Sequence, residues 1–254
     1  MTDIHRARPP AFPPHERDRK DAIVLVHGAW VGEWSWAPVL PMLRQSGRPV
    51  HAVSLRGHGA RRHESSPDVT LDDHVGDVVS LVETFDLSDV TLVAHSYGGR
   101  VITRSLTRLA ERVTRAIYLD ARAPLGDPLD EGQRLVADEH GMVPFADAYE
   151  PDPDEFGGTD AVDWFMERTM PQSASALNAP FHVEVPGHVD LTYIHATGDE
   201  SSRFARYAAA ARTDPTWRYI ELPGSHWLMV SHPREVAAII LDPALYSRER
   251  ANQR

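Results

Sequence analysis

The sequence contains no cysteine and only one lysine, Lys20, among its 254 residues. The absence of cysteine excludes disulfide bonds, thiolate zinc sites and a thiol nucleophile. Every other basic side chain apart from the histidines is arginine, which argues against a catalytic lysine or a Schiff base. The missing cysteines also leave the redox compartment open, because no disulfide pattern marks the chain as secreted.

Positive charge is scarce relative to negative charge. The chain carries 26 Lys and Arg against 37 Asp and Glu, a formal net charge of −11. This balance argues against nucleic acid or an anionic membrane as a partner. No stretch approaches the apolar length of a membrane span. Residues 1–20 lack an apolar core, so they are interpreted as a disordered leader and not a secretory signal, and a cytoplasmic location is expected by default.

Short apolar, β-rich runs alternate with helix-like segments along most of the chain. The runs are residues 23–26, 50–55, 90–94, 115–119, 191–196 and 218–222. The helix-like segments are residues 34–44, 71–85, 101–110, 201–211 and 233–241. Strands that alternate with helices favour right-handed crossovers and a parallel sheet covered on both faces. The predicted fold class is therefore α/β, with six mostly parallel strands.

The alternation stops once, in a long stretch rich in Pro, Gly, Asp and Glu. This stretch is too long for a plain connection, and it contains helix-like pieces at residues 130–139 and 160–169. Aromatic residues scattered through it favour a packed cap over an acidic surface excursion. Residues 122–188 are therefore predicted to form an inserted cap, with residues 21–121 and 189–245 forming the core domain.

Ser96 lies at the end of an apolar strand, in the run Ala94-His95-Ser96-Tyr97-Gly98-Gly99. A helix-compatible stretch begins near Arg100. The small residues Ala94 and Gly98 flank the serine, as a sharp strand-to-helix turn requires. Such a turn exposes the hydroxyl and aims backbone N–H groups at a developing oxyanion. The run predicts a nucleophile elbow, and the alternative is a glycine-rich turn with an incidental serine.

A serine nucleophile needs a base that removes its proton. Among the 14 histidines, His226 is the candidate because it lies in a glycine-containing loop after the last predicted strand. That loop is on the strand-end side where Ser96 also emerges. His27 follows the first strand and is an alternative base, but a structural role in bonding its own loop is favoured.

The base needs an acid that holds it in the correct tautomer. Asp199 is the candidate because it follows the strand that immediately precedes the one leading to His226. Asp120, at the end of another predicted strand, is a rival, and Glu200 is a further alternative.

Two backbone N–H groups are expected to form the oxyanion hole. One belongs to Tyr97, and the other to Ala29 in the glycine-containing turn after the first strand. The walls of the substrate pocket are predicted to come from aromatic residues, namely Trp30, Trp164, Phe165 and Trp227.

These motifs together resemble the plant methylesterase and hydroxynitrile lyase branch of the α/β-hydrolases and its bacterial relatives. The resemblance covers residues 21–241 and rests on residues 24–30, 55–59, 94–99, 193–199 and 224–226. It implies a triad of Ser96, Asp199 and His226 in that order, and oxyanion donors at Ala29 and Tyr97. It also implies a six-stranded core sheet, matching the six runs.

The branch contains both esterases and lyases. Its lyases carry a threonine after the oxyanion-strand histidine and a lysine after the catalytic histidine, where this chain has Gly28 and Trp227. Without that lysine, no cation is present for a departing cyanide. The predicted function is therefore a serine hydrolase of small or medium hydrophobic or aromatic esters or lactones, without metal or cofactor and with a small-molecule substrate as its partner. A carbon–carbon lyase and a ligand sensor with residual activity are the alternatives, and a homodimer stays open.

Overall fold

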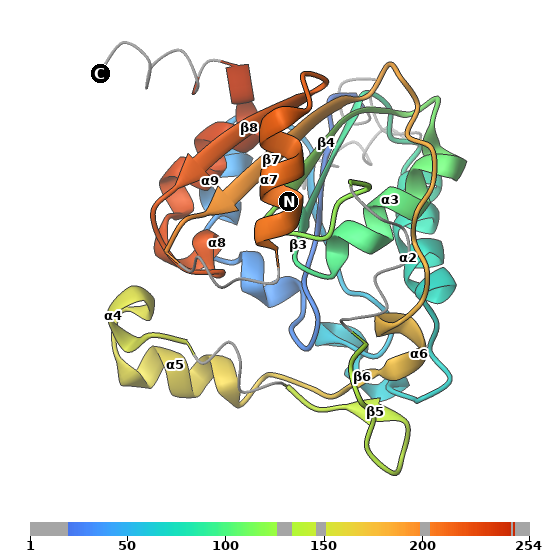
Figure 1. Ribbon diagram of the computed structural model, residues 1–254, viewed down its shortest axis with the longest axis vertical. Helices are drawn as coiled ribbons and strands as arrows, with labels where there is room; N and C mark the ends of the chain where they lie inside the picture. Colours follow the sequence, from blue (N-terminus) through green and yellow to red (C-terminus); the bar gives the residue numbers. More distant parts are fainter. Residues whose placement is uncertain (1–19, 126–133, 146–150, 199–203, 245, 247–254) are drawn as a thin grey trace, which may run out of the picture.

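The computed structural model describes residues 20–125, 134–145, 151–198, 204–244 and 246. Its centre is a six-stranded sheet with all neighbouring strands parallel, in the order β2–β1–β3–β4–β7–β8 (Figure 1). The strands are β1 (Ile23–Val26), β2 (Val50–Val53), β3 (Val90–His95), β4 (Val113–Leu119), β7 (Asp190–Ala196) and β8 (Trp217–Leu222). Each predicted run forms one strand, so the predicted fold class is confirmed.

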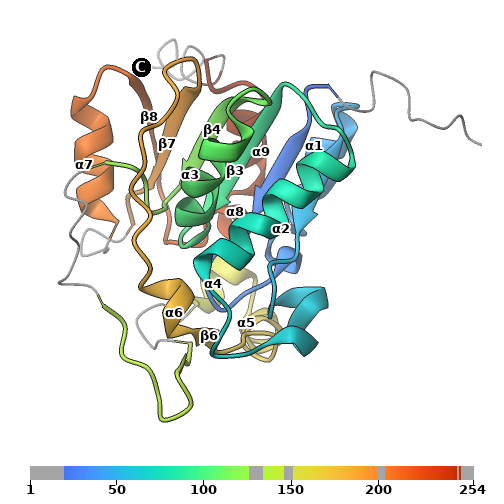
Figure 2. The same ribbon diagram turned by 90° about the vertical axis from the view of Figure 1, so that its right-hand side faces the viewer.

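Helices cover both faces of this sheet (Figure 2). One face packs against α2 (Leu71–Thr84), α3 (Gly98–Leu109) and α7 (Ala205–Thr213). The other packs against the 3₁₀-helix η2 (Glu33–Trp36), α1 (Leu40–Gln45), α8 (Leu228–Ser231) and α9 (Pro233–Leu241). Alternate residues of β1 face opposite layers, since Val24 lies in the first core and Leu25 in the second. The short 3₁₀ segment η3 (Gly59–Glu64) follows β2.

Two predicted helices differ from the structure. Residues 34–44 do not form one helix, because α1 begins only at Leu40 with Pro41 in its first turn. Proline has no backbone N–H and clashes with the preceding turn, so it is accommodated at a helix start and interrupts a helix interior. Within the predicted helix at residues 130–139, residues 134–138 are not helical, and residues 126–133 lie outside the described part of the chain.

The cap segment forms small elements that lie together beyond one edge of the sheet, at the bottom of Figure 1. They are β5 (Met142–Val143), α4 (Pro153–Phe156), α5 (Thr159–Met166), β6 (Gln172–Ser173) and α6 (Ala174–Leu177), with β5 and β6 paired antiparallel. Hydrogen bonds join them to the core: Met170 N–H donates to Trp30 O at 2.8 Å, and Ser173 Oγ donates to Val69 O at 2.5 Å. These bonds join the segment to the loop after β1 and to the residues just before α2.

The predicted leader, residues 1–20, lies outside the described residues except for Lys20. Among the helices that the structure does describe, none is both long and apolar enough to span a bilayer.

Candidate active site

Ser96 occupies a strained turn between β3 and α3. Its φ is +54°, in the left-handed region that side chains other than glycine rarely adopt. The glycines after it are required by close packing, because a Cβ on Gly98 would lie 2.7 Å from Val26 O and one on Gly99 would lie 2.0 Å from Arg122 O. The turn is therefore a tight strand-to-helix elbow, with Ser96 at its apex and 7% exposed.

The elbow lies where the strand order reverses. β1 pairs with β2 on one side and with β3 on the other, so the ends of β1 and β3 flank the point at which an open parallel sheet forms its ligand crevice. The loop after β1 comes very close to Ser96, since a Cβ on Gly28 would lie 3.0 Å from Ser96 Cβ. This proximity brings Ala29 to the same edge as Ser96.

The backbone N–H groups of Ala29 and Tyr97 are available at this edge. Both residues are buried, and neither N–H has a hydrogen-bond partner within the described ranges. Buried N–H groups without partners are uncommon, and a pair of them beside a nucleophile can stabilise an oxyanion. The geometry thus brings together the two donors that the sequence analysis predicted.

Backbone strain is concentrated around Ser96. Trp30 after β1, Ser96 after β3 and Asp120 after β4 have φ values of +64°, +54° and +40°. Such conformations cost about 1–3 kcal/mol each and persist where the surroundings hold them. Trp30 is held by its indole N–H, which donates to Val143 O at 2.9 Å, and by its backbone N–H, which donates to Gln172 Oε1 at 3.2 Å.

His226 is paired with Asp120. Its Nδ1–H donates to Asp120 Oδ2 at 2.6 Å, and both side chains are almost fully buried. The imidazole stacks on Phe204, with ring centroids 4.8 Å apart and an interplanar angle of 5°, and the centroid of the His95 ring lies 4.3 Å from its own. Because Nδ1 carries the proton, Nε2 carries the lone pair of this tautomer.

Within the described residues, an acid that contacts His226 is therefore Asp120, which the sequence analysis named as the rival candidate. The candidate Asp199 and the alternative Glu200 lie outside the described residues. The Gly198 loop that leads to Asp199 does lie against the histidine loop, because Gly198 N–H donates to Gly224 O at 2.8 Å. β4 is a direct neighbour of β7, which brings the end of β4, with Asp120, to the same edge. The choice of Asp199 as the acid stays a prediction.

Ser96 and His226 share neighbours without a hydrogen bond between them. The Ser96 hydroxyl has no hydrogen-bond partner in the described part of the chain. Phe204, which stacks on His226, also lines the cavity at Ser96. In unliganded sites such catalytic hydrogen bonds are often long and shorten only when substrate binds, so this arrangement is compatible with a nucleophile and its base.

Two other histidines near the elbow have structural roles. His27 Nδ1–H donates to Gly28 O at 2.8 Å, and its Nε2 accepts from Leu55 N–H at 3.2 Å, so it bonds its own loop as predicted. His95 Nε2–H donates to His226 O at 3.0 Å and holds the loop that carries His226. Burial lowers the pKa of both side chains well below the ordinary value, which keeps them neutral.

The cavity beside Ser96 is small. Its volume is about 20 Å³, enough for one water molecule. Its lining consists of Ala29, Trp30, Ser96, Tyr97, Arg122, Leu135, Leu177 and Phe204. Of the four predicted pocket residues, only Trp30 is among them. Sequence reasoning did not single out Arg122 or Phe204, since neither lies in a recognisable motif.

The other predicted pocket residues lie elsewhere. Trp164 and Phe165 line a separate apolar groove of about 270 Å³ between the cap and η2. Trp227 is 4% exposed and packs on Phe165, with ring centroids 4.6 Å apart. These aromatic residues therefore join the cap to the core and do not form the wall next to Ser96.

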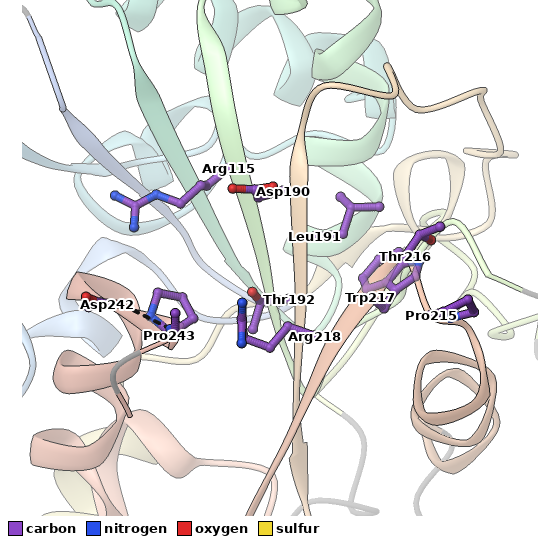
Figure 3. A pocket seen from close by; sticks show the side chains of 11 residues that line it. Arg115, Asp190, Leu191, Thr192, Pro215, Thr216, Trp217, Arg218, Asp242 and Pro243 are labelled. Atoms are coloured by element: carbon purple, nitrogen blue, oxygen red, sulfur yellow. Dashed lines mark hydrogen bonds between the residues drawn. The ribbon is translucent and has the colours of Figure 1, made fainter. Parts of the chain in front are cut away.

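A polar hollow of about 510 Å³ lies at the opposite edge of the sheet, at the amino ends of β4, β7 and β8 (Figure 3). Arg115 and Arg218 line it together with Asp190, and its lining includes no serine or histidine. It thus lacks the pairing of a serine with a histidine that the other edge of the sheet brings near one another. Across the described residues, no group of three or more His, Asp or Glu side chains is arranged to bind a metal ion.

Comparison with known proteins shows which family this chain belongs to. Residues 23–239 match the alpha/beta hydrolase family, and the chain belongs to it. The chain is 33% identical over 231 residues to a carbendazim-hydrolysing esterase of Nocardioides sp. (strain SG-4G), covering 84% of this chain and 96% of that protein. It is 32% identical over 111 residues to methylesterase 1 of Arabidopsis thaliana, which covers 43% of this chain and 42% of the plant protein.

Solved structures agree on the fold. A methylesterase from Arabidopsis superposes with a TM-score of 0.73 at 23% identity, covering 89% of this chain and 99% of that one. Polyneuridine aldehyde esterase superposes with a TM-score of 0.69 at 21% identity, covering 89% and 100%. The resemblance to the methylesterase branch is confirmed, and the esterase relatives support ester hydrolysis as the chemistry of this chain.

Proposed function

We propose that this protein hydrolyses carboxylic esters through an acyl-enzyme formed on Ser96. The observation that carries the proposal is the buried hydrogen bond from His226 Nδ1–H to Asp120, made at the same sheet edge as the strained serine. A neutral imidazole with its Nδ1 proton held by a carboxylate is the form that accepts a proton at Nε2.

The residues have distinct roles in this reaction. Ser96 Oγ attacks the ester carbonyl while His226 Nε2 takes the hydroxyl proton. The carbonyl oxygen becomes an oxyanion that accepts hydrogen bonds from the N–H groups of Ala29 and Tyr97. His226 then gives its proton to the departing alkoxide, which leaves as the alcohol. A water molecule, deprotonated by His226, attacks the acyl group and releases the acid.

Asp120 is assigned as the orienting acid in this proposal, in place of Asp199. Its carboxylate stabilises the imidazolium that forms in each step and keeps the Nδ1 tautomer. The assignment is supported by the 2.6 Å contact, since a carboxylate at that distance from Nδ1 fills the position that an orienting acid must take.

The substrate is proposed to be small. The cavity at Ser96 is tight, and apolar residues such as Trp30 and Phe204 form much of its lining. Relatives are named for carbendazim hydrolysis and as methylesterases, which makes methyl esters the first substrates to test. Cyanohydrin cleavage is disfavoured because Trp227 is buried at the position where the lyases carry a lysine, so mandelonitrile should release cyanide no faster with enzyme than in buffer.

Covalent labelling tests the nucleophile. A fluorophosphonate probe should modify the wild-type protein once, at Ser96. Ser96→Ala should fold normally, resist labelling and lose about 10⁴-fold or more in turnover of p-nitrophenyl acetate and methyl esters. Ser46→Ala, which changes a serine just after α1, is the matched control and should label like the wild type. Labelling at another residue, or full turnover by Ser96→Ala, would refute the proposal.

A further inference from the structure

The residue after Ala29 is bonded to the segment between β4 and β7. Trp30 N–H donates to Gln172 Oε1 at 3.2 Å, and its indole N–H donates to Val143 O at 2.9 Å. Trp30 O accepts from Met170 N–H at 2.8 Å. Val143 and Gln172 lie opposite each other in the pair of strands β5 and β6, beyond the edge of the main sheet (Figure 1). The loop after β1 is therefore held by residues that are distant in the sequence.

These bonds hold a backbone conformation that is strained. Trp30 has a φ of +64°, and such a conformation persists only where the surrounding structure determines it. Trp30 is also buried, and the Phe145 ring packs edge-on against its indole, with ring centroids 5.7 Å apart. A buried N–H or C=O that loses its partner costs free energy. The conformation of Trp30 thus depends on the segment that supplies its hydrogen-bond partners.

Two peptide units set the direction of the Ala29 N–H. A peptide unit is planar, so a hydrogen bond at one end also orients the other end. The unit that carries the Ala29 N–H is held at its carbonyl, because Gly28 O accepts from His27 Nδ1–H at 2.8 Å. The next unit is held at its N–H, which belongs to Trp30 and donates to Gln172 Oε1. His27 and Gln172 therefore fix the backbone on the two sides of Ala29.

Gln172 bonds this loop from the middle of a buried contact. Its side chain is 1% exposed, and a buried amide oxygen needs a donor, which Trp30 N–H supplies. The next residue of the same strand, Ser173, is also buried but bonds elsewhere: its hydroxyl donates to Val69 O at 2.5 Å and accepts from Ala176 N–H at 3.2 Å. β6 thus makes two buried polar contacts, and only the one from Gln172 reaches the loop of Ala29.

We propose that Gln172 is a positioning residue for the oxyanion hole, which it serves by holding the peptide between Ala29 and Trp30. The inference rests on the proposed ester hydrolysis at Ser96, and it adds a residue that acts through Ala29 without touching the substrate. The oxyanion exists only in the transition state and the tetrahedral intermediate. A donor that points in the wrong direction therefore lowers kcat and leaves KM nearly unchanged.

Kinetics of three variants on p-nitrophenyl acetate and methyl acetate test this role. Gln172→Met keeps the length of the side chain but removes the accepting oxygen. It should lower kcat by about 10- to 100-fold, the range for a misplaced catalytic group, with KM within about twofold of the wild type. Ser173→Ala removes the neighbouring buried hydroxyl and should keep kcat within about twofold. Gln172→Glu restores an accepting oxygen, in a carboxyl group that burial favours in its neutral form, and should exceed the kcat of Gln172→Met at least about threefold.

Other outcomes overturn the role of Gln172. A higher KM with an unchanged kcat in Gln172→Met would mean that this side chain acts on substrate binding. An equal loss of kcat in Ser173→Ala would mean that any weakened contact of β6 disturbs the site. If Gln172→Met fails to fold, Gln172→Asn takes its place, because it keeps the amide and withdraws the oxygen by one carbon, and it should show the same loss of kcat.

Hydrogen exchange of the Trp30 amide separates this inference from the proposed function, because it needs no turnover. The amide should exchange at least about tenfold faster in Gln172→Met than in the wild type, and at the wild-type rate in Ser173→Ala. If Ser96 hydrolyses esters and Gln172→Met keeps the wild-type kcat, the positioning role is wrong and the esterase stands. If the wild type hydrolyses no ester, the proposed function is wrong and the positioning role fails with it, whereas faster exchange would still show that Gln172 holds the loop.

Discussion

At the scale of single residues, the proposed mechanism depends on Asp120, the acid proposed to hold the Nδ1 proton of His226. The Asp120 side chain is 1% exposed, and its backbone is held in a left-handed conformation. A buried carboxylate beside Nδ1 stabilises the imidazolium strongly because little water screens the pair. The Asp120 backbone N–H donates to Ile194 O at 2.7 Å, which helps to hold this strained conformation.

Replacement of either candidate acid distinguishes the two assignments. Asp120→Asn should lower kcat by about 10⁴-fold, because an amide at that position favours the wrong tautomer of the histidine. Asp199→Asn is the comparison variant and should cost less than about tenfold. Turnover of a methyl ester by both folded variants is the measurement. The reverse ranking would return the role of the acid to Asp199.

At the scale of elements, the start of α3 is packed against the chain that leaves β4. Gly99→Ala should destabilise the protein by about 3 kcal/mol or more, because its Cβ would lie 2.0 Å from the backbone oxygen of Arg122. Gly76→Ala in α2 is the control, where an added Cβ meets nothing within 4 Å and should stabilise by about 0.5–1 kcal/mol. Urea unfolding measures both. Similar effects of the two substitutions would contradict the packing argument.

The helix α4 is joined to the loop that carries His226, the proposed base. Glu155 accepts hydrogen bonds from Ser225 N–H, at 3.0 Å, and from Ser225 Oγ, and Ser225 immediately precedes His226. Glu155→Ala should therefore lower kcat/KM for methyl esters by about tenfold, the effect of losing a charge-assisted hydrogen bond that orders the loop.

An exposed cap residue provides the control for this variant. Glu167→Ala removes a carboxylate at the end of α5 whose ion pair with Arg168 is exposed, and it should leave kcat/KM within about twofold. Unchanged kinetics in Glu155→Ala would mean that the cap does not position His226.

At the scale of the whole molecule, several histidines are buried in neutral form. Burial lowers the pKa of His58 and of His74 from the ordinary 6.5 to about 4, and the neighbouring charge of His74 adds to the effect on His58. His74 Nδ1 accepts from Tyr97 Oη at 2.8 Å, and its Nε2–H donates to Arg56 O at 3.0 Å. These contacts connect the elbow residue Tyr97 to the loop after β2.

Stability should consequently fall in mild acid. Between pH 6.5 and about 4 the unfolded chain protonates these histidines while the folded chain does not, so the unfolded state binds more protons. The contribution of these histidines to the free energy of unfolding is fully present above pH 6.5. As the pH falls through that window, each histidine lowers the free energy of unfolding by up to about 1.4 kcal/mol per pH unit. Urea unfolding at pH 7.5, 6 and 5 measures the slope.

Two variants show which histidines cause this change of the free energy of unfolding with pH. His74→Gln should reduce it by up to about 1.4 kcal/mol per pH unit, since one titrating group is removed. His63→Gln changes a side chain that is 74% exposed and should leave the slope unchanged. Stability that is constant from pH 7.5 to 5 would contradict the neutral, buried state of these histidines.

Local sequence patterns predicted the sheet, the elbow and the candidate base His226. Apolar runs predicted all six strands, because a strand buried on both faces needs continuous apolar residues. The small residues around Ser96 predicted the elbow, because only a few side chains fit a turn that tight. His226 followed from its place after the last strand. Each of these inferences depends on residues that are close together in the chain.

The tertiary structure alone decided which side chains meet. Asp120 and His226 are 106 residues apart, and their contact depends on how β4, β7 and β8 lie side by side. The same packing moved Trp164 away from Ser96 and brought Arg122 to it. Sequence periodicity reports which face of an element is buried, but the partner across the core is set by strand order and by the path of the cap, which no local pattern encodes.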